Sequence, residues 1–409
     1  MLNVNLNEVE IVDDNISKLE TLKNVINKTE ADDSLHLLDL GNVLKKYQDW
    51  SQKMPRVLPY FAMKSNPEPT ILKLLSSLGV SFDCASKEEI VQLMGLGVPS
   101  DRIIFANPVK FPTHLKYARK VGVALMTADH EIELKKIKEI YPEAKVVIRI
   151  RCDSKTAMIS LGEKFGCDPE KEAINLIKVA MKLNLELSGF AFHVGTLCDD
   201  VDAFCREIRT CNNLIQTARF LGCKTANIID IGGGFPGDRN FDLDELTGPI
   251  NDALEKVDLS IKIIAEPGRY FVTSAVTIAA QIISKKIAIE NGKKKFMYYV
   301  TDGIYGSFAC SSINTRSRRP RVLNPICNTN KKYISTIWGP TCDSRDCILK
   351  EELLPEYYIG EWLIWYDLGA YTACFSSKFN GFKPPRVYSI MHRSDWKSMQ
   401  MYINKKNSK

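Results

Sequence analysis

Short apolar runs alternate with longer amphipathic stretches from about residue 34 to residue 274. The runs have the length of strands, and the stretches between them repeat apolar residues at helical spacing. The predicted strands are Leu35–Asp39, Tyr60–Met63, Ser81–Cys84, Ile103–Ala106, Leu125–Thr127, Lys145–Ile150, Glu186–His193, Asn227–Ile231 and Ile261–Glu266. Repeated strand-then-helix units predict a parallel sheet, and a closed (β/α)8 barrel fits their number better than an open sheet.

The pattern changes after about Ala275, where β-rich runs are separated by Gly, Pro and Asn. These runs are Thr277–Lys285, Phe296–Thr301, Tyr333–Trp338, Glu361–Tyr366 and Val387–Met391. The sequence therefore predicts two domains, a barrel over residues 35–274 and a mainly β domain, a sandwich or barrel, made of residues 1–34 and 275–409. The proline-containing segment Arg316–Lys332 is predicted to be an exposed loop.

Composition supports a large globular protein, because 45% of the 409 residues are hydrophobic. The 55 Lys and Arg residues are mostly interleaved with the 49 Asp and Glu residues, which is typical of a solvated surface and not of a nucleic-acid footprint. One local exception has no acid within it: Arg316, Arg318, Arg319 and Arg321. A solvated loop is the simpler interpretation of this basic segment.

The 12 cysteines are scattered without CxxC or Cys/His spacing, so we expect reduced thiols and no metal site. The first residues, Met1–Asp14, are polar and acidic, and no run of about 18 apolar residues occurs. We therefore expect a cytoplasmic protein that does not span a membrane.

A lysine closes one of the predicted strands. Lys64 follows Tyr60–Met63, and Asn66-Pro67 interrupts the chain directly after it. In a (β/α)8 barrel the carboxyl ends of the strands form the mouth where active sites lie. Desolvation there is expected to lower the pKa of Lys64 and to favour a Schiff base with an aldehyde cofactor. The alternative is a lysine that extends from a strand end into solvent.

Other strand ends carry groups that such a cofactor needs. One strand runs into Gly232, Gly233 and Gly234, where bare backbone N–H groups can approach a phosphate. Another runs into Glu266, which can keep a pyridine nitrogen protonated, and Arg269, which can bind a phosphate.

His193 ends a further strand and could stack on a flat ring. Each group alone has a structural alternative: a glycine turn, an ion pair at the barrel rim or a structural histidine. Together they predict one cofactor site.

With these motifs the chain resembles the group IV, fold-type III pyridoxal-phosphate decarboxylases, and within them the eukaryotic ornithine decarboxylases. The resemblance runs from about Leu35 to Trp396. It implies an alanine-racemase-like fold, a pyridoxal 5'-phosphate cofactor, and decarboxylation of L-ornithine to putrescine. In that family a glutamate at the place of Glu266 distinguishes decarboxylases from racemases, which use arginine.

The resemblance also implies roles for residues of the barrel. Lys64 would form the Schiff base, Glu266 would pair with the ring nitrogen, and His193 would stack on the ring. The other cofactor-binding residues it implies are Asp83, Arg149, Thr196, Gly232, Gly233, Gly234, Gly268 and Arg269, and Glu89 would support the lysine and the cofactor together with Asp83. Thr196 stands where the family usually has serine.

Residues of the second domain complete the expected site. Tyr371 matches a phosphate-contacting tyrosine, Cys342 the proton donor and Asp343 a substrate-binding carboxylate. In this family Cys342 and Asp343 reach the site of the other subunit, which implies a homodimer with shared active sites. Tyr305 would lie at that interface.

The match breaks where the family has a Tyr-Asp pair that helps to bind the distal amine of the substrate. This chain has Ile313-Asn314 there. Losing one charge-assisted contact costs about 1.5 to 3 kcal/mol, or roughly 10- to 150-fold in affinity. Asp343 remains, so a diamino acid is the first expectation.

Three hypotheses stay open: an ornithine decarboxylase, a paralogue acting on another amino acid such as lysine or a less charged one, and a non-enzymatic regulator like the antizyme inhibitors. The joint presence of the cofactor-binding residues with Cys342 and Asp343 argues against the third. The segment Leu115–Lys136 resembles the antizyme-binding element of the family, and its alternative is an ordinary basic barrel helix and strand.

Overall fold

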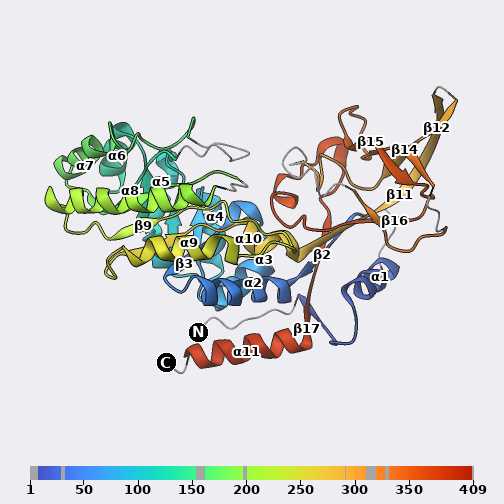
Figure 1. Cartoon of the computed structure of the whole chain (residues 1–409), viewed down its shortest axis with the longest axis horizontal. Helices are drawn as coiled ribbons and strands as arrows, with labels where there is room; N and C mark the ends of the chain where they lie inside the picture. Colours follow the sequence, from blue (N-terminus) through green and yellow to red (C-terminus); the bar gives the residue numbers. More distant parts are fainter. Residues whose placement is uncertain are drawn as a thin grey trace.

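The computed structural model describes residues 8–28, 33–152, 162–196, 200–290, 292–309, 319–327 and 331–407. Parallel strands close into a barrel, which confirms the predicted fold class (Figure 1). In barrel order the strands are β3 (Val57–Ala62), β4 (Ser81–Cys84), β5 (Ile103–Phe105), β6 (Leu125–Ala128), β7 (Lys145–Arg149), β8 (Glu186–Ala191), β9 (Ile228–Asp230) and β10 (Lys262–Ala265). Pairing of Ile263 in β10 with Val57 in β3 closes the ring.

Helices cover the outside of the barrel. They are α2 (Leu40–Lys53), α3 (Pro69–Ser77), α4 (Lys87–Gly95), α5 (Pro112–Val121), α6 (Glu131–Ile140), α7 (Ala173–Lys182), α8 (Val201–Phe220), α9 (Asp244–Glu255) and the short α10 (Arg269–Val272). Their starts follow local chemistry: proline opens α3 and α5, and the Ser86 hydroxyl accepts a hydrogen bond from the Glu89 backbone at the start of α4.

Side chains fill the barrel interior below its mouth. Tyr60, Ile104, Ile228 and Ile264, from four different strands, form a separate buried cluster. Lys262 donates a hydrogen bond of 2.9 Å to the Tyr60 hydroxyl. Because this layer is packed, the space for a ligand lies at the carboxyl ends of the strands.

A nine-stranded sheet forms the second unit, on the right in Figure 1. Its main path runs β1 (Val9–Val12), β17 (Arg386–His392), β2 (Leu35–Asp39), β11 (Val276–Glu290), β12 (Lys293–Val300), β14 (Lys332–Trp338) and β15 (Cys347–Pro355). Strand β16 (Trp362–Trp365) pairs with β11 and with β13 (Arg321–Val322). Helices α1 (Lys18–Lys28) and α11 (Arg393–Asn407) also lie outside the barrel.

The structure corrects two details of the sequence analysis. Leu35–Asp39, placed at the start of the barrel segment 35–274, pairs with β11 and β17 in the second sheet. The sequence offered nine strands for a barrel that closes with eight, and β2 is buried along its whole length in either environment. Part of the expected loop Arg316–Lys332 is strand β13, while Arg316 and Arg318 lie outside the described residues.

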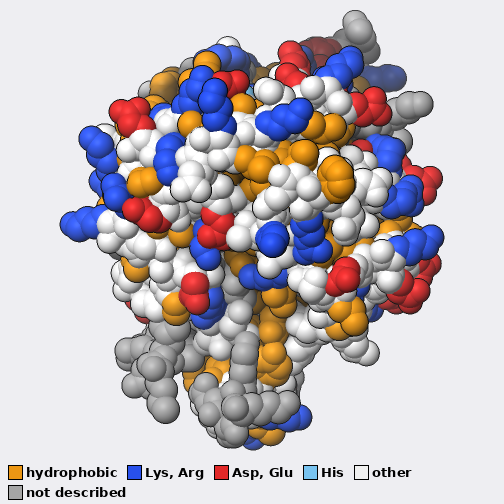
Figure 2. Space-filling model, turned by 90° about the vertical axis from the view of Figure 1, so that its left-hand side faces the viewer, with side chains coloured by type: hydrophobic (Ala, Val, Ile, Leu, Met, Phe, Trp, Pro, Cys, Tyr) orange, Lys and Arg blue, Asp and Glu red, His pale blue; other side chains and the backbone are white. Residues whose placement is uncertain are grey.

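The surface of the barrel mixes charges of both signs. Figure 2 shows Lys and Arg side chains scattered among Asp and Glu side chains over one face. The cysteines within the described ranges are free thiols. In that same part of the chain, no helix combines the length and the apolar character needed to cross a membrane.

Candidate active site

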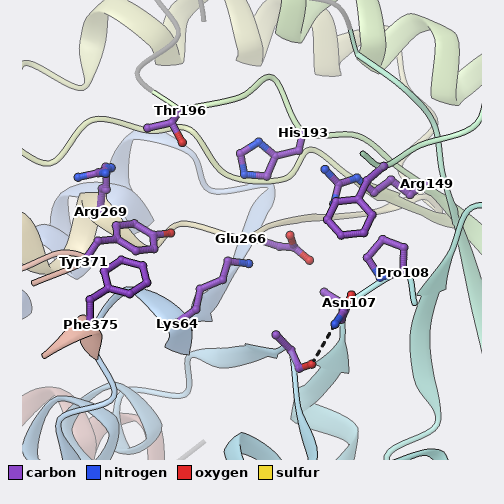
Figure 3. A pocket seen from close by; sticks show the side chains of 13 residues that line it. Lys64, Asn107, Pro108, Arg149, His193, Thr196, Glu266, Arg269, Tyr371 and Phe375 are labelled. Atoms are coloured by element: carbon purple, nitrogen blue, oxygen red, sulfur yellow. Dashed lines mark hydrogen bonds between the residues drawn. The ribbon is translucent and has the colours of Figure 1, made fainter. Parts of the chain in front are cut away.

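A cavity of about 390 Å³ opens at the carboxyl ends of the barrel strands (Figure 3). Its lining combines residues predicted from the sequence with others that were not. The lining residues are Lys64, Ala85, Ala106, Asn107, Pro108, Arg149, Phe165, His193, Thr196, Glu266, Arg269, Tyr371 and Phe375. Figure 3 shows Arg269, Tyr371 and Thr196 at one side, Arg149 and Pro108 at the other, and Lys64, His193 and Glu266 between them.

Lys64 lies just after β3 and points into the cavity. A short 3-10 turn, Met63–Ser65, carries it, and 42% of its side chain is exposed to the cavity. Its Nζ donates a hydrogen bond of 2.6 Å to Oδ2 of Asp83, the inward residue of β4. Asp83 is 1% exposed, so solvent screens this ion pair little.

The expected direction of the Lys64 pKa was wrong for the chain alone. Burial does oppose the charge, but Asp83, Glu266 and Tyr371 outweigh burial, and the pKa of Lys64 is raised above its ordinary value. Desolvation alone lowers the pKa of a lysine, but the carboxyls on the adjacent strands reverse the shift here.

Glu266 and Asp230 form a pair of buried carboxyls. Burial, followed by the charges of Asp230 and Asp83, raises the pKa of Glu266 well above its usual range. Burial raises the pKa of Asp230 to about 7. Oε1 of Glu266 and Oδ2 of Asp230 each lack a donor among the described residues, yet the two side chains lie within hydrogen-bonding reach. Because neither carboxylate can donate, we infer that they share one proton.

His193 follows β8 and is uncharged. Its Nδ1 accepts a hydrogen bond of 3.0 Å from the Gly195 backbone N–H, which leaves the ring proton on Nε2. Burial, together with Arg149 and Lys64, lowers the pKa of His193 well below its ordinary value. Its ring faces the cavity (Figure 3).

Arg149 ends β7 on the other side of the cavity. Its guanidinium lies 5.2 Å from the centre of the Phe165 ring, and burial lowers its pKa. Glu89, expected to support the lysine and the cofactor, accepts a hydrogen bond from the Ala85 backbone N–H just before α4. It thereby holds Ala85, which lines the cavity.

The tri-glycine turn after β9 approaches the neighbouring strand ends closely. Gly232 donates its backbone N–H to Oδ1 of Asp230 at 2.9 Å, and its carbonyl accepts from the Glu266 N–H at 2.7 Å. A Cβ at Gly233 would lie 2.8 Å from the Glu266 carbonyl oxygen, and one at Gly234 2.7 Å from that of Gly195. Gly234 also has φ +106°. Both positions therefore require glycine.

Arg269 and Tyr371 form the other side of the cavity. The Arg269 guanidinium lies 4.7 Å from the centre of the Tyr371 ring, and its Nε, although buried, has no acceptor among the described residues. Gly268 packs against Ser65, where a Cβ would lie 2.9 Å from that of Ser65. Tyr371 comes from the second unit, and its N–H donates to the Ser65 carbonyl at 2.8 Å.

These groups fit a flat heteroaromatic ring that carries an anion. The glycines, Thr196 and the unsatisfied Arg269 Nε suit the anion. The unsatisfied Glu266 Oε1 suits a protonated ring nitrogen, and His193 offers an uncharged ring face.

The structure does not bring Tyr305, Cys342 and Asp343 to this cavity. They form a second cluster in the sheet unit, where the Tyr305 hydroxyl donates a hydrogen bond to Asp343 and Cys342 is exposed. We call Tyr305, Cys342, Asp343 and Arg345 the distal cluster. Asn314 lies outside the described residues.

Sequence reasoning missed several residues around both clusters. Asn107 and Pro108 follow the end of β5 with only Ala106 between, so the rule used for Lys64 would have found them. Asp230 was assigned only to the strand, because Ile228–Asp230 is buried on both faces and gives no alternation. Arg345 contacts Asp343 through a turn that has no hydrophobic signature.

Comparison with known proteins gives a consistent result. Residues 40–273 match the family model for the pyridoxal binding domain of pyridoxal-dependent decarboxylases, and residues 241–369 match the C-terminal sheet domain. The chain is 39% identical over 411 residues to ornithine decarboxylase of Mus musculus, covering 96% of this chain and 89% of that protein. It is also 39% identical to antizyme inhibitor 2 of Xenopus laevis, covering 94% and 86%.

Solved structures of related enzymes share the fold. The arginine decarboxylase of Paramecium bursaria Chlorella virus, bound to agmatine, has a TM-score of 0.86 at 33% identity, covering 91% of this chain and all of that one. The lysine/ornithine decarboxylase of Vibrio vulnificus, complexed with cadaverine, has a TM-score of 0.81 at 30% identity, covering 91% and 99%. By its sequence, its barrel and its cavity, the chain belongs to the family of pyridoxal-dependent decarboxylases.

Proposed function

We propose that this protein decarboxylates a basic amino acid, with L-ornithine as the first substrate to test and putrescine as its product. The observation that carries the proposal is the single cavity that gathers Lys64, Glu266 and Arg269 from three strand ends. An amine, a buried carboxyl and a guanidinium in one cavity are what a pyridoxal phosphate decarboxylase requires.

Pyridoxal phosphate, when bound, supplies a protonated pyridine ring that accepts the electrons released as the carbon–carboxylate bond breaks. We assign its attachment to Lys64 Nζ, which Asp83 orients. Glu266, held by Asp230, keeps the ring nitrogen protonated, and His193 packs on the ring.

The anion end of the site is assigned to the groups that lack partners in the chain. Arg269, Thr196, Tyr371 and the Gly232–Gly234 backbone would hold the phosphate, with Gly268 giving room beside Ser65. Arg149 stands across the cavity near Glu266, where its charge opposes part of the rise that burial causes in the pKa of that carboxyl.

We infer that the active site is shared between two copies of the chain. Cys342 is exposed and Asp343 lies apart from the cavity in the same protomer, so each needs a second copy to act there. In this proposal the barrel unit binds the cofactor, and the sheet unit gives the other subunit Cys342, which returns a proton to the substrate carbon, and Asp343. Tyr305 and Asn314 would lie beside that substrate.

A second candidate is decarboxylation of another amino acid, because related structures include arginine and lysine/ornithine decarboxylases. The observation that favours it is the ion pair between Asp343 and Arg345 at 2.7 Å. A regulator like the antizyme inhibitors is a third candidate, but a chain with that role alone would not need Lys64, Glu266 and Cys342.

The test is to incubate the purified protein and pyridoxal phosphate with ornithine, lysine or arginine separately and to identify the amine by mass spectrometry. Putrescine as the main product supports the proposal. Cadaverine or agmatine as the main product would identify lysine or arginine, and not ornithine, as the substrate. No amine from any amino acid, with dimers intact, supports the regulator.

Antizyme remains a proposed partner. The segment Leu115–Lys136 spans part of α5, all of β6 and the first turns of α6. Lys116, Lys120 and Lys135 are exposed there, whereas Lys136 pairs with Glu133 at 2.6 Å. Retention of the protein on immobilised antizyme would support this assignment, and no retention would remove it.

A further inference from the structure

The carboxylate of Asp343 is already occupied by groups of its own chain. Arg345 Nη2 donates to Oδ2 at 2.7 Å, and Arg345 Nε lies 3.0 Å from Oδ2 and 3.2 Å from Oδ1. The Arg345 backbone N–H donates to Oδ1 at 2.9 Å, and the Tyr305 hydroxyl donates to Oδ2. A carboxylate has about four acceptor sites, and these donors use them.

A buried carboxylate fixes this arrangement. Asp346, which is 0% exposed, accepts hydrogen bonds from the Ile304 N–H at 2.8 Å and from the Thr341 N–H at 3.0 Å. It thereby joins the turn that carries Tyr305 to the turn that carries Asp343. The Asp346 backbone N–H also donates to the Asp343 carbonyl at 2.9 Å. The pairing of Asp343 with Arg345 is therefore built into two linked turns.

The pair has no net charge. Asp343 contributes one negative charge and Arg345 one positive charge, and hydrogen bonds from Arg345 and Tyr305 lower the pKa of Asp343, so the pair stays ionised. The Arg345 side chain is 80% exposed and that of Asp343 is 14% exposed. An incoming ammonium has three donors and no acceptor, so it can bind Asp343 only by displacing a donor already there, and the Arg345 side chain is the exposed one.

We propose that Arg345 is a specificity-determining residue that competes with the distal ammonium of a diamino acid for Asp343. This inference rests on the proposed function, because it assigns Asp343 to the distal end of the substrate. The distal subsite then favours side chains that end in an uncharged or acceptor group more than the family pattern alone would predict. The sequence also has Asn314 where the family has an aspartate, so it offers one carboxylate fewer for a distal ammonium.

The test compares Arg345→Met with the parent dimer loaded with pyridoxal phosphate. Calorimetry with putrescine measures binding of a distal ammonium, and n-butylamine is the matched probe without one. We expect Arg345→Met to tighten putrescine binding by up to about 5-fold, the upper end of the range for an exposed ion pair, and to leave n-butylamine binding unchanged. Where ornithine is turned over, its KM should fall by a similar factor.

Three variants control the experiment. Arg319→Met removes one charge in the same unit, where Arg319 pairs with Glu352, and should leave putrescine binding unchanged. Arg345→Lys keeps the cation and should stay near the parent. Asp343→Asn combined with Arg345→Met should abolish the gain, because the two residues act as one pair.

Unchanged putrescine affinity in Arg345→Met, or an equal gain for n-butylamine, would overturn the proposal. A protein that makes no putrescine from ornithine fails the proposed function, yet the calorimetric comparison still tests Arg345 on its own.

Discussion

The cavity in the barrel and the distal cluster in the sheet unit differ in whether their carboxyl oxygens have hydrogen-bond donors. In the cavity Asp83, Asp230 and Glu266 are held away from solvent, and oxygens of all three lack donors among the described residues. In the distal cluster the acceptor sites of Asp343 are filled and its partner Arg345 is exposed. The carboxyl oxygens without donors in the cavity suit a cationic ring, whereas the acceptor sites of Asp343 are already used by Arg345 and Tyr305.

This difference indicates which region determines cofactor binding and which determines substrate specificity. Unsatisfied buried groups are costly, so they persist where a bound molecule completes them. A surface ion pair contributes little to stability and can change without loss of fold. We therefore expect substitutions in the barrel cavity to affect cofactor binding, and substitutions in the distal cluster to affect substrate choice.

The largest predicted effect comes from replacing Lys64 in the cavity. Lys64→Ala should lower decarboxylation by at least about 10³-fold and abolish the visible absorbance of the attached cofactor, because no amine remains to hold it. Steady-state rates and absorbance spectra measure both. Lys73→Ala on α3, whose lysine pairs only with Glu8 among the described residues, is the control and should leave both unchanged. Attached cofactor in Lys64→Ala would refute the assignment.

A smaller effect is expected from the proton shared by Asp230 and Glu266. Burial raises the pKa of Asp230 to about 7, so the folded chain keeps a proton that the unfolded chain releases. This contribution to stability is complete below the unfolded-state pKa of about 4 and is lost as the pH rises to about 7. Asp230→Asn is neutral throughout and should weaken the dependence, because only the buried Glu266 carboxyl of the pair is left to titrate.

Thermal denaturation of the cofactor-free protein at several pH values measures this pH dependence of stability. The difference in Tm, Asp230→Asn minus parent, should be larger at about pH 7.5 than at about pH 5, by about 2 °C or more. Asp252→Asn, exposed on α9, should give no such trend. Parallel curves for Asp230→Asn and the parent would contradict the shared proton.

The smallest effect is expected in the distal cluster. Tyr305→Phe removes the hydroxyl that holds Asp343 in place. Because one exposed hydrogen bond is lost, we expect the KM for ornithine to rise by up to about 5-fold. Cofactor absorbance should not change. A loss of cofactor from Tyr305→Phe would mean that the two regions are not separate in function.

Much of the barrel could be predicted from the sequence because its strands are apolar runs with polar residues at their ends. Ser81–Cys84 was predicted with the observed bounds, and its inward residue Asp83 lies beside Lys64. Strand β2 was misplaced because a strand buried throughout looks the same in a barrel and in the centre of a mixed sheet. Pairing partners are set by tertiary structure, which periodicity does not encode.

The raised pKa of Lys64 could not be predicted from its own segment. It depends on Asp83 and Glu266, which are 19 and 202 positions away in the chain and come together only when the barrel closes. Arg345 was missed for a different reason: its contact with Asp343 spans two residues of a turn, where side-chain direction follows from Asp346 and not from any repeat.

The central claim is that one site needs the barrel of one chain and Cys342 of another, and mixing two inactive variants tests it most directly. Lys64→Ala and Cys342→Ala each lack one half of every site, so either homodimer should be inactive. Equal mixing with subunit exchange makes half of the dimers mixed, each with one intact site, and should restore about a quarter of the parental activity. No recovery, with exchange verified by the masses of tagged subunits, would contradict the shared site.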